Sequence, residues 1–284
     1  MTGLLVLDFD GTMTDAEREG APYRTGVLED VALLTGWPQQ RVFDRAAEVE
    51  AEIAANPHAH GWQFGGQIVA PASVDPYLRI MPVARQIFDE AGVYRDEADR
   101  ARLLEGLLYK YNYRKTAIAF RDGARETLLA MTGKPVYVVT NSHTDAVQDK
   151  IRHLGGGGDG GPLSWLVPRV FGSARKFVLD DSFDAVPSEM RLPGLDRPVL
   201  LRRRDYHDAL FRLLREQGCD WSDLVVCGDI FELDLALPMA MGARVGLVVN
   251  PFTPPWEKAF LADHPRGALL TDVPSIRAFC GWDD

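Results

Sequence analysis

The apolar residues of the chain follow different periodicities in different stretches, and this divides the sequence into three blocks. The first block is short: a continuous apolar run over 4–7 is followed by a turn signal at Gly11-Thr12, a pattern that predicts a buried strand. In the second block, from about residue 20 to 118, apolar residues recur at helical spacing, as in the series Val42, Phe43, Ala46, Ala47, Val49 and Ile53. We therefore expect this block to be helical.

Turn-forming residues separate the predicted helices of the second block. Asn56-Pro57 ends one helix, Asp75-Pro76 begins another, and Gly92 is expected to cap the end of the second. A third apolar face recurs over 103–111. Residues 57–73 lie between the first two helices, contain glycines and aromatic residues, and are predicted to form a loop.

The third block alternates between short apolar runs and helical runs. The apolar runs are 136–139, 199–201, 224–226 and 245–249, and the helical runs are 144–154, 205–217 and 233–241. This alternation is typical of a parallel sheet covered on both faces, and the N-terminal strand is expected to join it. The prediction is an α/β fold: a Rossmann-like parallel sheet core with helices on both faces, over 1–15 and 118–284, plus an inserted all-helical cap domain over 16–117.

Charge and composition narrow the classes of function. The chain has 284 residues, and its 31 basic and 41 acidic residues give a formal net charge of −10. We therefore expect no nucleic-acid or membrane partner, and an anionic ligand must be held by local positive charge. The apolar run before Asp8 is too short for a signal peptide or for the ~20 residues of a membrane span. Three cysteines are too few for a disulfide framework or a zinc site, so we expect a soluble, cytoplasmic protein.

Two carboxylates directly follow the first predicted strand. In an open α/β sheet, ligands bind at the carboxyl ends of the strands, which is where Asp8 and Asp10 lie. Two carboxylates this close repel each other and stay ionised together only beside a cation, most simply Mg²⁺ with its preference for oxygen ligands. The same letters overlap the EF-hand calcium loop, but that loop begins from a helix, whereas here a buried strand precedes it.

Two further strand ends carry polar side chains. Thr140 presents a hydroxyl after the run at 136–139, and the backbone N–H groups of Asn141 and Ser142 suit a phosphate oxygen; alternatively Thr140 is an ordinary helix cap. After the run at 224–226, Asp229 adds a third carboxylate at the same sheet edge. Asp234 either joins this set or complements the dipole of the following helix.

The three strand ends together resemble the motifs of the haloacid dehalogenase superfamily. The matching segments are DFDGTMTD at 8–15, VVTNS at 138–142 and GDIFELD at 228–234. The resemblance covers about residues 1–15 and 118–250, and it matches the inserted block in position but not in motif. It implies a Mg²⁺-dependent phosphatase that acts on a small phosphorylated metabolite.

The resemblance also implies roles for single residues. Asp8 would attack phosphorus to form an aspartyl-phosphate, and Asp10 would protonate the leaving oxygen and then deprotonate water. Mg²⁺ would be held by Asp8, the main-chain carbonyl of Asp10 and Asp229, with Asp234 in the same acidic set. Haloacid dehalogenases proper lack an acid at the position of Asp10, which favours phosphoryl chemistry here.

The cationic residue that should clamp the phosphate is less clearly defined by the sequence. The family has a lysine shortly before the helix that leads to the GD strand, whereas this chain has Arg202, Arg203 and Arg204 there. Arg204 fits best by its distance to the helix, Arg203 is an alternative, and Lys176 is a rival. Asn141 and Thr140 complete the predicted substrate contacts.

Two alternatives to the phosphatase stay open at this stage. A phosphomutase differs only in whether water or a sugar hydroxyl accepts the phosphoryl group. A catalytically silent phosphate- or metal-binding member would keep the fold, but such a protein does not require an acid at Asp10. A cap that closes over the core favours small substrates over phosphoproteins, and hinges are expected near 13–20 and 118–123. Neither the substrate nor the oligomeric state is predicted.

Overall fold

The computed structural model describes residues 3–56, 60–112, 117–158 and 160–282, and its chain forms two compact units. The first unit comprises Met1–Asp15, Gln63–Ala70 and Phe120–Asp284. The second comprises Ala16–Trp62 and Pro71–Ala119. Gln63–Ala70 therefore group with the first unit, although the sequence places them inside the helical insertion.

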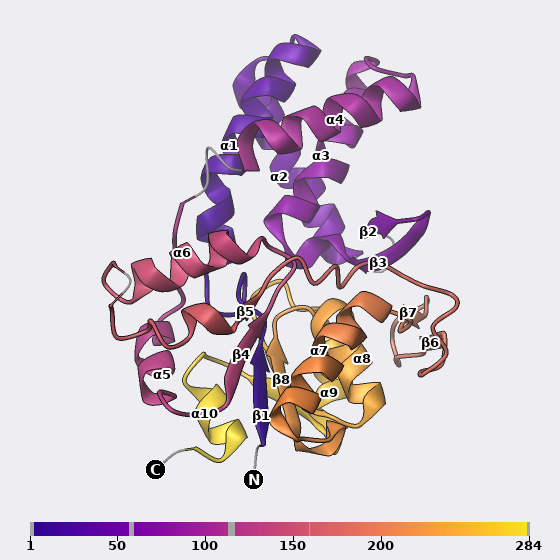
Figure 1. Ribbon diagram of the computed structural model, residues 1–284. Helices are drawn as coiled ribbons and strands as arrows, with labels where there is room; N and C mark the ends of the chain where they lie inside the picture. The colour runs from indigo at the N-terminus through magenta and orange to yellow at the C-terminus, as the bar shows by residue number, and fades with distance from the viewer. Residues whose placement is uncertain (1–2, 57–59, 113–116, 159, 283–284) are drawn as a thin grey trace. The chain divides into compact units, whose positions relative to one another are not determined.

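The first unit is built on a six-stranded parallel sheet in the order β10-β9-β8-β1-β4-β5. Figure 1 labels β8, β1, β4 and β5 of this sheet. The strand β1 lies between β4 and β8, so that Leu7 is opposite both Val138 and Cys227. All four residues of β1 are buried, which explains why its sequence is a continuous apolar run. The strands are β1 (Leu4–Leu7), β4 (Val136–Val139), β5 (Val170–Phe171), β8 (Leu224–Gly228), β9 (Arg244–Val248) and β10 (Gly267–Leu270).

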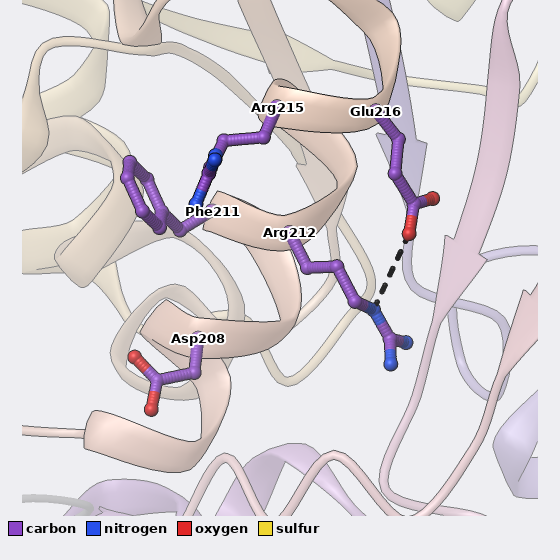
Figure 2. A pocket seen from close by; sticks show the side chains of 5 residues that line it. All are labelled: Asp208, Phe211, Arg212, Arg215 and Glu216. Atoms are coloured by element: carbon purple, nitrogen blue, oxygen red, sulfur yellow. Dashed lines mark ion pairs between the residues drawn. The ribbon is translucent and has the colours of Figure 1, made fainter.

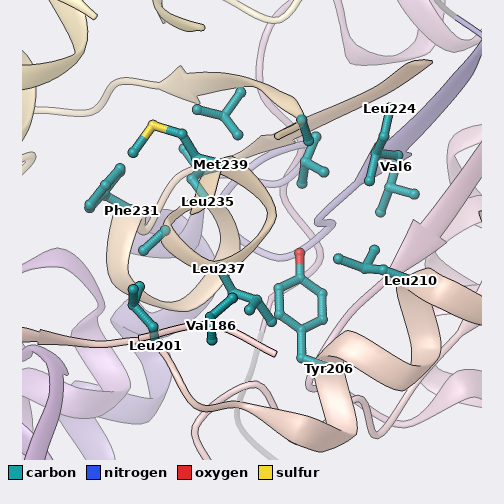
Figure 3. Close-up of a cluster of buried hydrophobic side chains, with 14 of the residues drawn as sticks. Val6, Val186, Leu201, Tyr206, Leu210, Leu224, Phe231, Leu235, Leu237 and Met239 are labelled. Atoms are coloured by element: carbon teal, nitrogen blue, oxygen red, sulfur yellow. The ribbon is translucent and has the colours of Figure 1, made fainter. Parts of the chain in front are cut away.

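Helices cover both faces of this sheet, and the alternation of side chains along each strand creates two hydrophobic cores. Leu4 and Val6 belong to one core, and Leu5 and Leu7 belong to the other. Figure 3 shows part of the first core, with Val6 labelled. The first core is closed by α7 (Arg204–Gln217), α8 (Ala236–Met241) and α9 (Pro255–Asp263). The second is closed by α5 (Ala124–Ala130), α6 (Thr144–Leu154) and α10 (Ser275–Cys280).

The apolar run at 199–201 was expected in the parallel sheet, and the structure corrects this. Val199–Leu200 form β7, which pairs antiparallel with β6 (Glu189–Met190) in a separate two-stranded ribbon. The run is apolar because Val199 and Leu201 pack into the core beneath α7. The edge of the sheet next to β4 is formed by β5, a strand of two residues that is too short for a recognisable sequence pattern.

The second unit is a group of helices around its own hydrophobic core. Asp75 caps α3 by accepting the backbone N–H of Tyr77 at 2.7 Å, and Gly92 ends this helix in the left-handed conformation, as the sequence predicts. The elements of the unit are α1 (Ala16–Thr35), α2 (Gln39–Ala55), the 3₁₀ turn η1 (Ala72–Val74), α3 (Pro76–Ala91) and α4 (Glu97–Asn112).

The predicted loop at 57–73 contains a β-hairpin. Its strands are β2 (Gly61–Phe64) and β3 (Gln67–Pro71), joined through Gly65 and Gly66, whose φ angles of 58° and 78° suit a tight hairpin turn. The insertion is therefore not all-helical. Residues 57–59 at its start lie outside the described part of the chain.

In the described part of the chain, the helices are all too short or too polar to span a lipid bilayer.

Candidate active site

Three neighbouring strands deliver the polar residues of the site to one edge of the sheet. Asp8 directly follows β1, Thr140 follows β4, and Asp229 follows β8. These strands are adjacent and parallel, so their carboxyl ends meet at the same edge. Asp8 and Asp229 are more than two hundred residues apart in the sequence, and the structure brings their side chains together.

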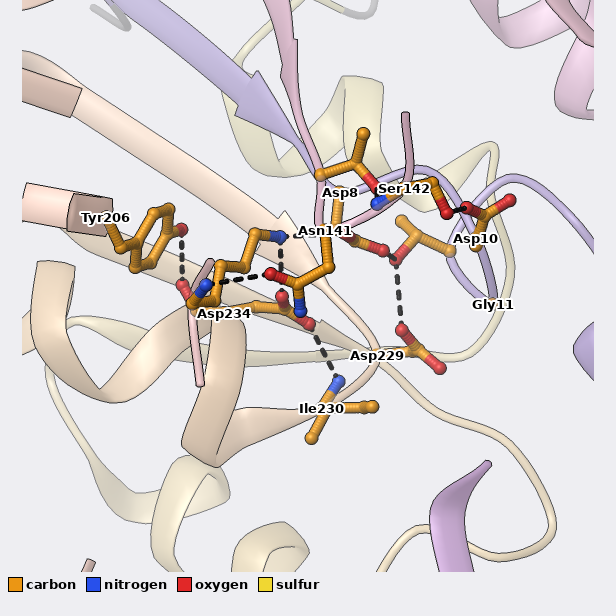
Figure 4. A network of polar contacts seen from close by, with 12 residues as sticks. Asp8, Asp10, Gly11, Asn141, Ser142, Tyr206, Asp229, Ile230 and Asp234 are labelled. Atoms are coloured by element: carbon orange, nitrogen blue, oxygen red, sulfur yellow. Dashed lines mark hydrogen bonds and ion pairs between the residues drawn. The ribbon is translucent and has the colours of Figure 1, made fainter. Parts of the chain in front are cut away.

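The centre of the site is a buried lysine, Lys176, between the buried carboxylates of Asp8 and Asp234. Figure 4 labels the two carboxylates. Lys176 Nζ donates to Asp8 Oδ1 at 2.7 Å and to Asp234 Oδ1 at 2.8 Å, and its side chain is 1% exposed. Burial alone would lower the pKa of Lys176, but Asp234 and Asp8 raise it above its ordinary value. Lys176 is therefore a cation fixed directly beside Asp8.

Burial has the opposite effect on Asp8. Loss of water contact raises the pKa of Asp8 to about 7, against the lowering effect of Lys176 and with a further increase from Asp234. Asp8, Asp229 and Asp234 are all buried, and each has an oxygen within 4.8 Å of the others. One lysine does not balance three carboxylates, so the cluster favours binding of a further positive charge.

The surroundings of Asp229 fit a small hard cation. Thr12 Oγ1 lies 3.1 Å from Asp8 Oδ2 and 3.3 Å from Asp229 Oδ1, and it holds the two carboxylates near each other. Gly11 has φ 84°, and a Cβ there would lie 2.3 Å from Asp229 Oδ2, so a larger residue would fill the cradle. Oxygen ligands in an acidic, buried cradle match the preferences of Mg²⁺. Asp8 and Asp229 are side chains that could hold such an ion.

Asp234 belongs to the same acidic cluster and is held by two protein donors. Its Oδ2 accepts the backbone N–H of Ile230 at 3.0 Å, and its Oδ1 accepts Lys176. Asp234 projects from the π-helical turn η4 (Phe231–Leu235). A Cβ on Gly228 would lie 2.5 Å from the Cβ of Asp234. Both of its oxygens therefore accept protein donors, and one of these donors is Lys176.

Asp10 lies at the more exposed side of the site. Ser142 Oγ donates to its Oδ2 at 2.5 Å, and Lys150 Nζ donates to its Oδ1 at 2.6 Å. The side chain of Asp10 is 30% exposed, whereas that of Asp8 is 10% exposed. A carboxyl group that is solvent-accessible and held by two donors is suited to exchanging a proton with a bound molecule.

Thr140 and Asn141 were predicted to bind substrate, and the structure places both beside the cluster. Thr140 is buried, and its Oγ1 accepts the backbone N–H of Ser142 at 3.2 Å. The Asn141 side chain accepts the backbone N–H of Lys176 at 2.7 Å. In this structure Asn141 therefore holds the lysine segment.

The three consecutive arginines lie outside the carboxylate cluster. Arg204, the first choice for the phosphate clamp, pairs with Asp180 and contacts Ser182 Oγ, and its side chain is 42% exposed. Arg202 donates to the backbone of Asp181, and Arg203 is buried against main-chain carbonyls. Lys176, the rival, lies directly beside Asp8. Residues 177–203 separate this lysine from α7, so the distance along the chain to that helix favoured Arg204 over Lys176.

Several contributors to the site carry no recognisable sequence signal. Lys150 lies within α6 and reaches Asp10 only through the packing of that helix. Tyr206 donates its hydroxyl to the backbone carbonyl of Asp234 at 2.8 Å, and its ring lies 5.3 Å from Lys176 Nζ. Thr12 belongs to the first motif, but its contact with Asp229 is a tertiary one.

A separate surface hollow lies on the outer side of α7 (Figure 2). All of its lining residues come from that one helix. Within it, Arg212 Nε lies 3.9 Å from Glu216 Oε1. It contains none of the residues gathered at the sheet edge. The lining residues are Asp208, Phe211, Arg212, Arg215 and Glu216.

The sequence and the fold of the chain are both similar to those of known proteins. A family model described as haloacid dehalogenase-like hydrolase matches residues 2–236. A conserved haloacid dehalogenase-like protein of unknown function from Agrobacterium tumefaciens is 16% identical, with a TM-score of 0.54 over 99% of this chain and 98% of its own. A predicted phosphoglycolate phosphatase from Haemophilus somnus is 14% identical, with a TM-score of 0.53 over 98% and 97%. No curated protein matches the sequence. At these identities the likeness to the solved structures concerns the fold.

Proposed function

Since the chain belongs to the haloacid dehalogenase-like hydrolase family, we propose that it is a Mg²⁺-dependent phosphatase of small phosphorylated metabolites. The observation that carries this proposal is the pairing of two differently placed carboxylates. Asp8 is buried beside Lys176, and Asp10 is partly exposed beside Ser142 and Lys150. The first arrangement suits a nucleophile, and the second suits an acid and base.

In the first half of the reaction, an Asp8 oxygen forms a bond to phosphorus while the bond from phosphorus to the leaving oxygen breaks. Asp10 gives its proton to that leaving oxygen, and the product alcohol departs. Lys176 contacts Asp8 directly and so offsets the negative charge of the phosphoryl oxygens. An aspartyl-phosphate remains on Asp8.

In the second half, Asp10 removes a proton from a water molecule whose oxygen bonds to phosphorus. The bond between phosphorus and Asp8 breaks, and inorganic phosphate leaves with Asp8 and Asp10 restored. When bound, Mg²⁺ would be held by Asp8, Asp229 and the main-chain carbonyl of Asp10, and it would neutralise charge on the phosphoryl oxygens.

The presence of Asp10 separates this proposal from dehalogenase chemistry. Displacement of a halide requires no proton donor at the leaving group, whereas an alkoxide leaving group does. Ser142 and Lys150 hold the Asp10 carboxyl group at the site, so an acid is both present and positioned.

The test is phosphate release from a panel of phosphate esters, with Mg²⁺ and with EDTA. The panel contains p-nitrophenyl phosphate, phosphoglycolate and several sugar phosphates; phosphoglycolate is included because of the named structural neighbour. We expect Mg²⁺-dependent release by the wild type and none by Asp8→Asn. Asp149→Asn, on the exposed side of α6, is the matched control and should retain the wild-type rate. No release from any ester would contradict the proposal, and transfer of phosphate to a sugar hydroxyl would indicate a mutase.

A further inference from the structure

The backbone of Lys176 is held on both sides by side chains from other elements. Its N–H is accepted by Asn141 Oδ1 at 2.7 Å, and its carbonyl accepts Arg203 Nη1 at 2.5 Å. The side chain in turn ends between Asp8 and Asp234. Both peptide groups of the proposed phosphate-binding lysine are thus fixed by tertiary contacts.

The segment that delivers Lys176 has an unusual backbone conformation. Ser173 and Arg175 have φ angles of 54° and 47°, which residues with a side chain rarely adopt. Gly172 lies so close to α6 that a Cβ would approach the backbone N of Thr144 to 2.3 Å. Such a conformation persists only where the surroundings impose it, so the contacts to Lys176 help to maintain the backbone of this segment.

Arg203 supplies the contact to the Lys176 carbonyl. It is fully buried, and besides the Lys176 carbonyl its guanidinium donates to Leu200 O at 3.0 Å and to Val69 O at 2.9 Å. Burial lowers the pKa of Arg203 to about 10, which still leaves it charged at neutral pH. A lysine at this position has no planar fork of donors with which to reach three carbonyls.

We propose that Arg203 is a positioning residue for Lys176 and that it fixes the β2–β3 hairpin to the segment that carries this lysine. The Val69 carbonyl belongs to β3, so one guanidinium joins the hairpin to Lys176. A second contact runs in parallel: the rings of Phe64 on β2 and Phe177, the residue after the lysine, are 5.2 Å apart and meet edge to face. Gln63–Ala70 accordingly group with the catalytic unit. The kinetic part of this inference rests on the proposed phosphatase activity.

Arg203→Lys is the first variant, because it keeps the positive charge and removes the forked geometry. We expect kcat for p-nitrophenyl phosphate to fall by ~10- to 100-fold, since a small displacement of a positioned catalytic group has costs of this order. Arg215→Lys, on the exposed face of α7, is the matched control and should retain wild-type kcat. Retention of wild-type kcat by Arg203→Lys would overturn the inference.

A double-mutant cycle separates positioning from a general structural role. If Arg203 acts through Lys176, then Arg203→Lys lowers kcat in the wild-type background but causes no further loss in the Lys176→Met background. A purely structural role would multiply the two losses and would contradict the inference. Asn141→Ala removes the restraint on the other side of Lys176, keeps Arg203 intact, and should show the same non-additivity.

Hydrogen–deuterium exchange tests the link to the hairpin without any substrate. We expect Arg203→Lys to accelerate exchange both in 63–70 and in 174–178, and Asn141→Ala to accelerate it only in 174–178. Unchanged exchange at 63–70 in Arg203→Lys would overturn the link. This readout is independent of turnover, so an inactive wild type would contradict the proposed function and leave the exchange result to decide this inference. If Arg203→Lys fails to fold, Phe64→Ala takes its place, and accelerated exchange at 174–178 is again the result expected.

Discussion

At Lys176 one ammonium group faces two carboxylates, and a third carboxylate lies within 4.8 Å of both. Each partner is buried, so water weakens these interactions little. Lys176 is therefore the cation directly beside Asp8, and we propose that it contacts a phosphoryl oxygen. Arg204, at the surface beside Asp180, has neither property.

Replacing Lys176 with methionine tests this assignment. Lys176→Met should lower kcat for p-nitrophenyl phosphate by ~100- to 1000-fold, the usual cost of removing one donor to a developing charge. Arg204→Met should stay near the wild-type rate. Steady-state kinetics on both variants, with thermal melts to establish folding, checks the pair. Impairment of Arg204→Met with an active Lys176→Met would return the clamp to the arginine.

We expect Lys150 to affect the proposed reaction through Asp10. Its ammonium and the Ser142 hydroxyl hold the two oxygens of that carboxyl group. Lys150→Met should lower turnover of an alkyl phosphate by ~10-fold or more but affect p-nitrophenyl phosphate less, because nitrophenolate leaves without a proton. The ratio of the two rates is the measurement. An unchanged ratio would show that Lys150 does not position the acid.

The single residues that sequence patterns identified are those held in local motifs. Asp8 and Asp10 follow one strand, and Asp229 and Asp234 follow another, so spacing along the chain places each pair. Lys176 remained one of several candidates because the segment between it and α7 has no fixed length. Lys150 and Arg203 act through contacts between distant segments, for which the sequence holds no local signal.

Among the elements, predicted bounds match best where helical periodicity and end signals coincide. The helix expected over 144–154 is α6 (Thr144–Leu154), because its apolar face is regular and its start and end are marked. The prediction that 199–201 form a strand of the parallel sheet was wrong, because an apolar pattern indicates burial but does not specify which strand the segment pairs with. The β2–β3 hairpin was missed because its short strands lack clear alternation.

The junction of β5 with α6 gives a prediction at this scale. Gly172 packs against the backbone of Ser142 and Thr144, so a methyl group there must displace the segment leading to Lys176. Gly172→Ala should lower the free energy of unfolding by about 1–3 kcal/mol and lower kcat as well. Gly106→Ala, at an open position inside α4, should instead stabilise by ~0.5–1 kcal/mol with no change in kcat. Equal behaviour of the two variants would argue against a packed junction.

Over the whole molecule, the chain has a net charge of −10, and its proposed phosphate site has one buried lysine beside Asp8. The acidic surface gives no general attraction for anions, so the site itself must supply it. Acidic groups also enter the core. Glu257, in the first turn of α9, is fully buried. Loss of water contact raises its pKa well above the usual 4.5, and the negative charge of the nearby Glu232 raises it further.

The pH dependence of stability should reveal Glu257. Above about pH 4.5 the unfolded chain releases this proton while the folded chain keeps it, so stability falls as the pH rises, by up to about 1.4 kcal/mol per pH unit. Glu257→Gln should remove this contribution, and its stability relative to the wild type should grow from about pH 5 to about pH 7. Melting curves across this range, with the exposed Glu216→Gln as control, give the comparison. A constant difference between Glu257→Gln and the wild type would refute the assignment.

The central claim is that Asp8 carries the phosphoryl group during turnover. The most direct measurement is acid quenching of the enzyme during reaction with p-nitrophenyl phosphate and Mg²⁺, followed by mass spectrometry of the peptide that contains Asp8. Asp10→Asn slows release of the intermediate and should enrich it. We predict the mass increase of one phosphoryl group at Asp8, absent when EDTA replaces Mg²⁺. Steady turnover with an unmodified Asp8 peptide, or with a label on another residue, would contradict the account.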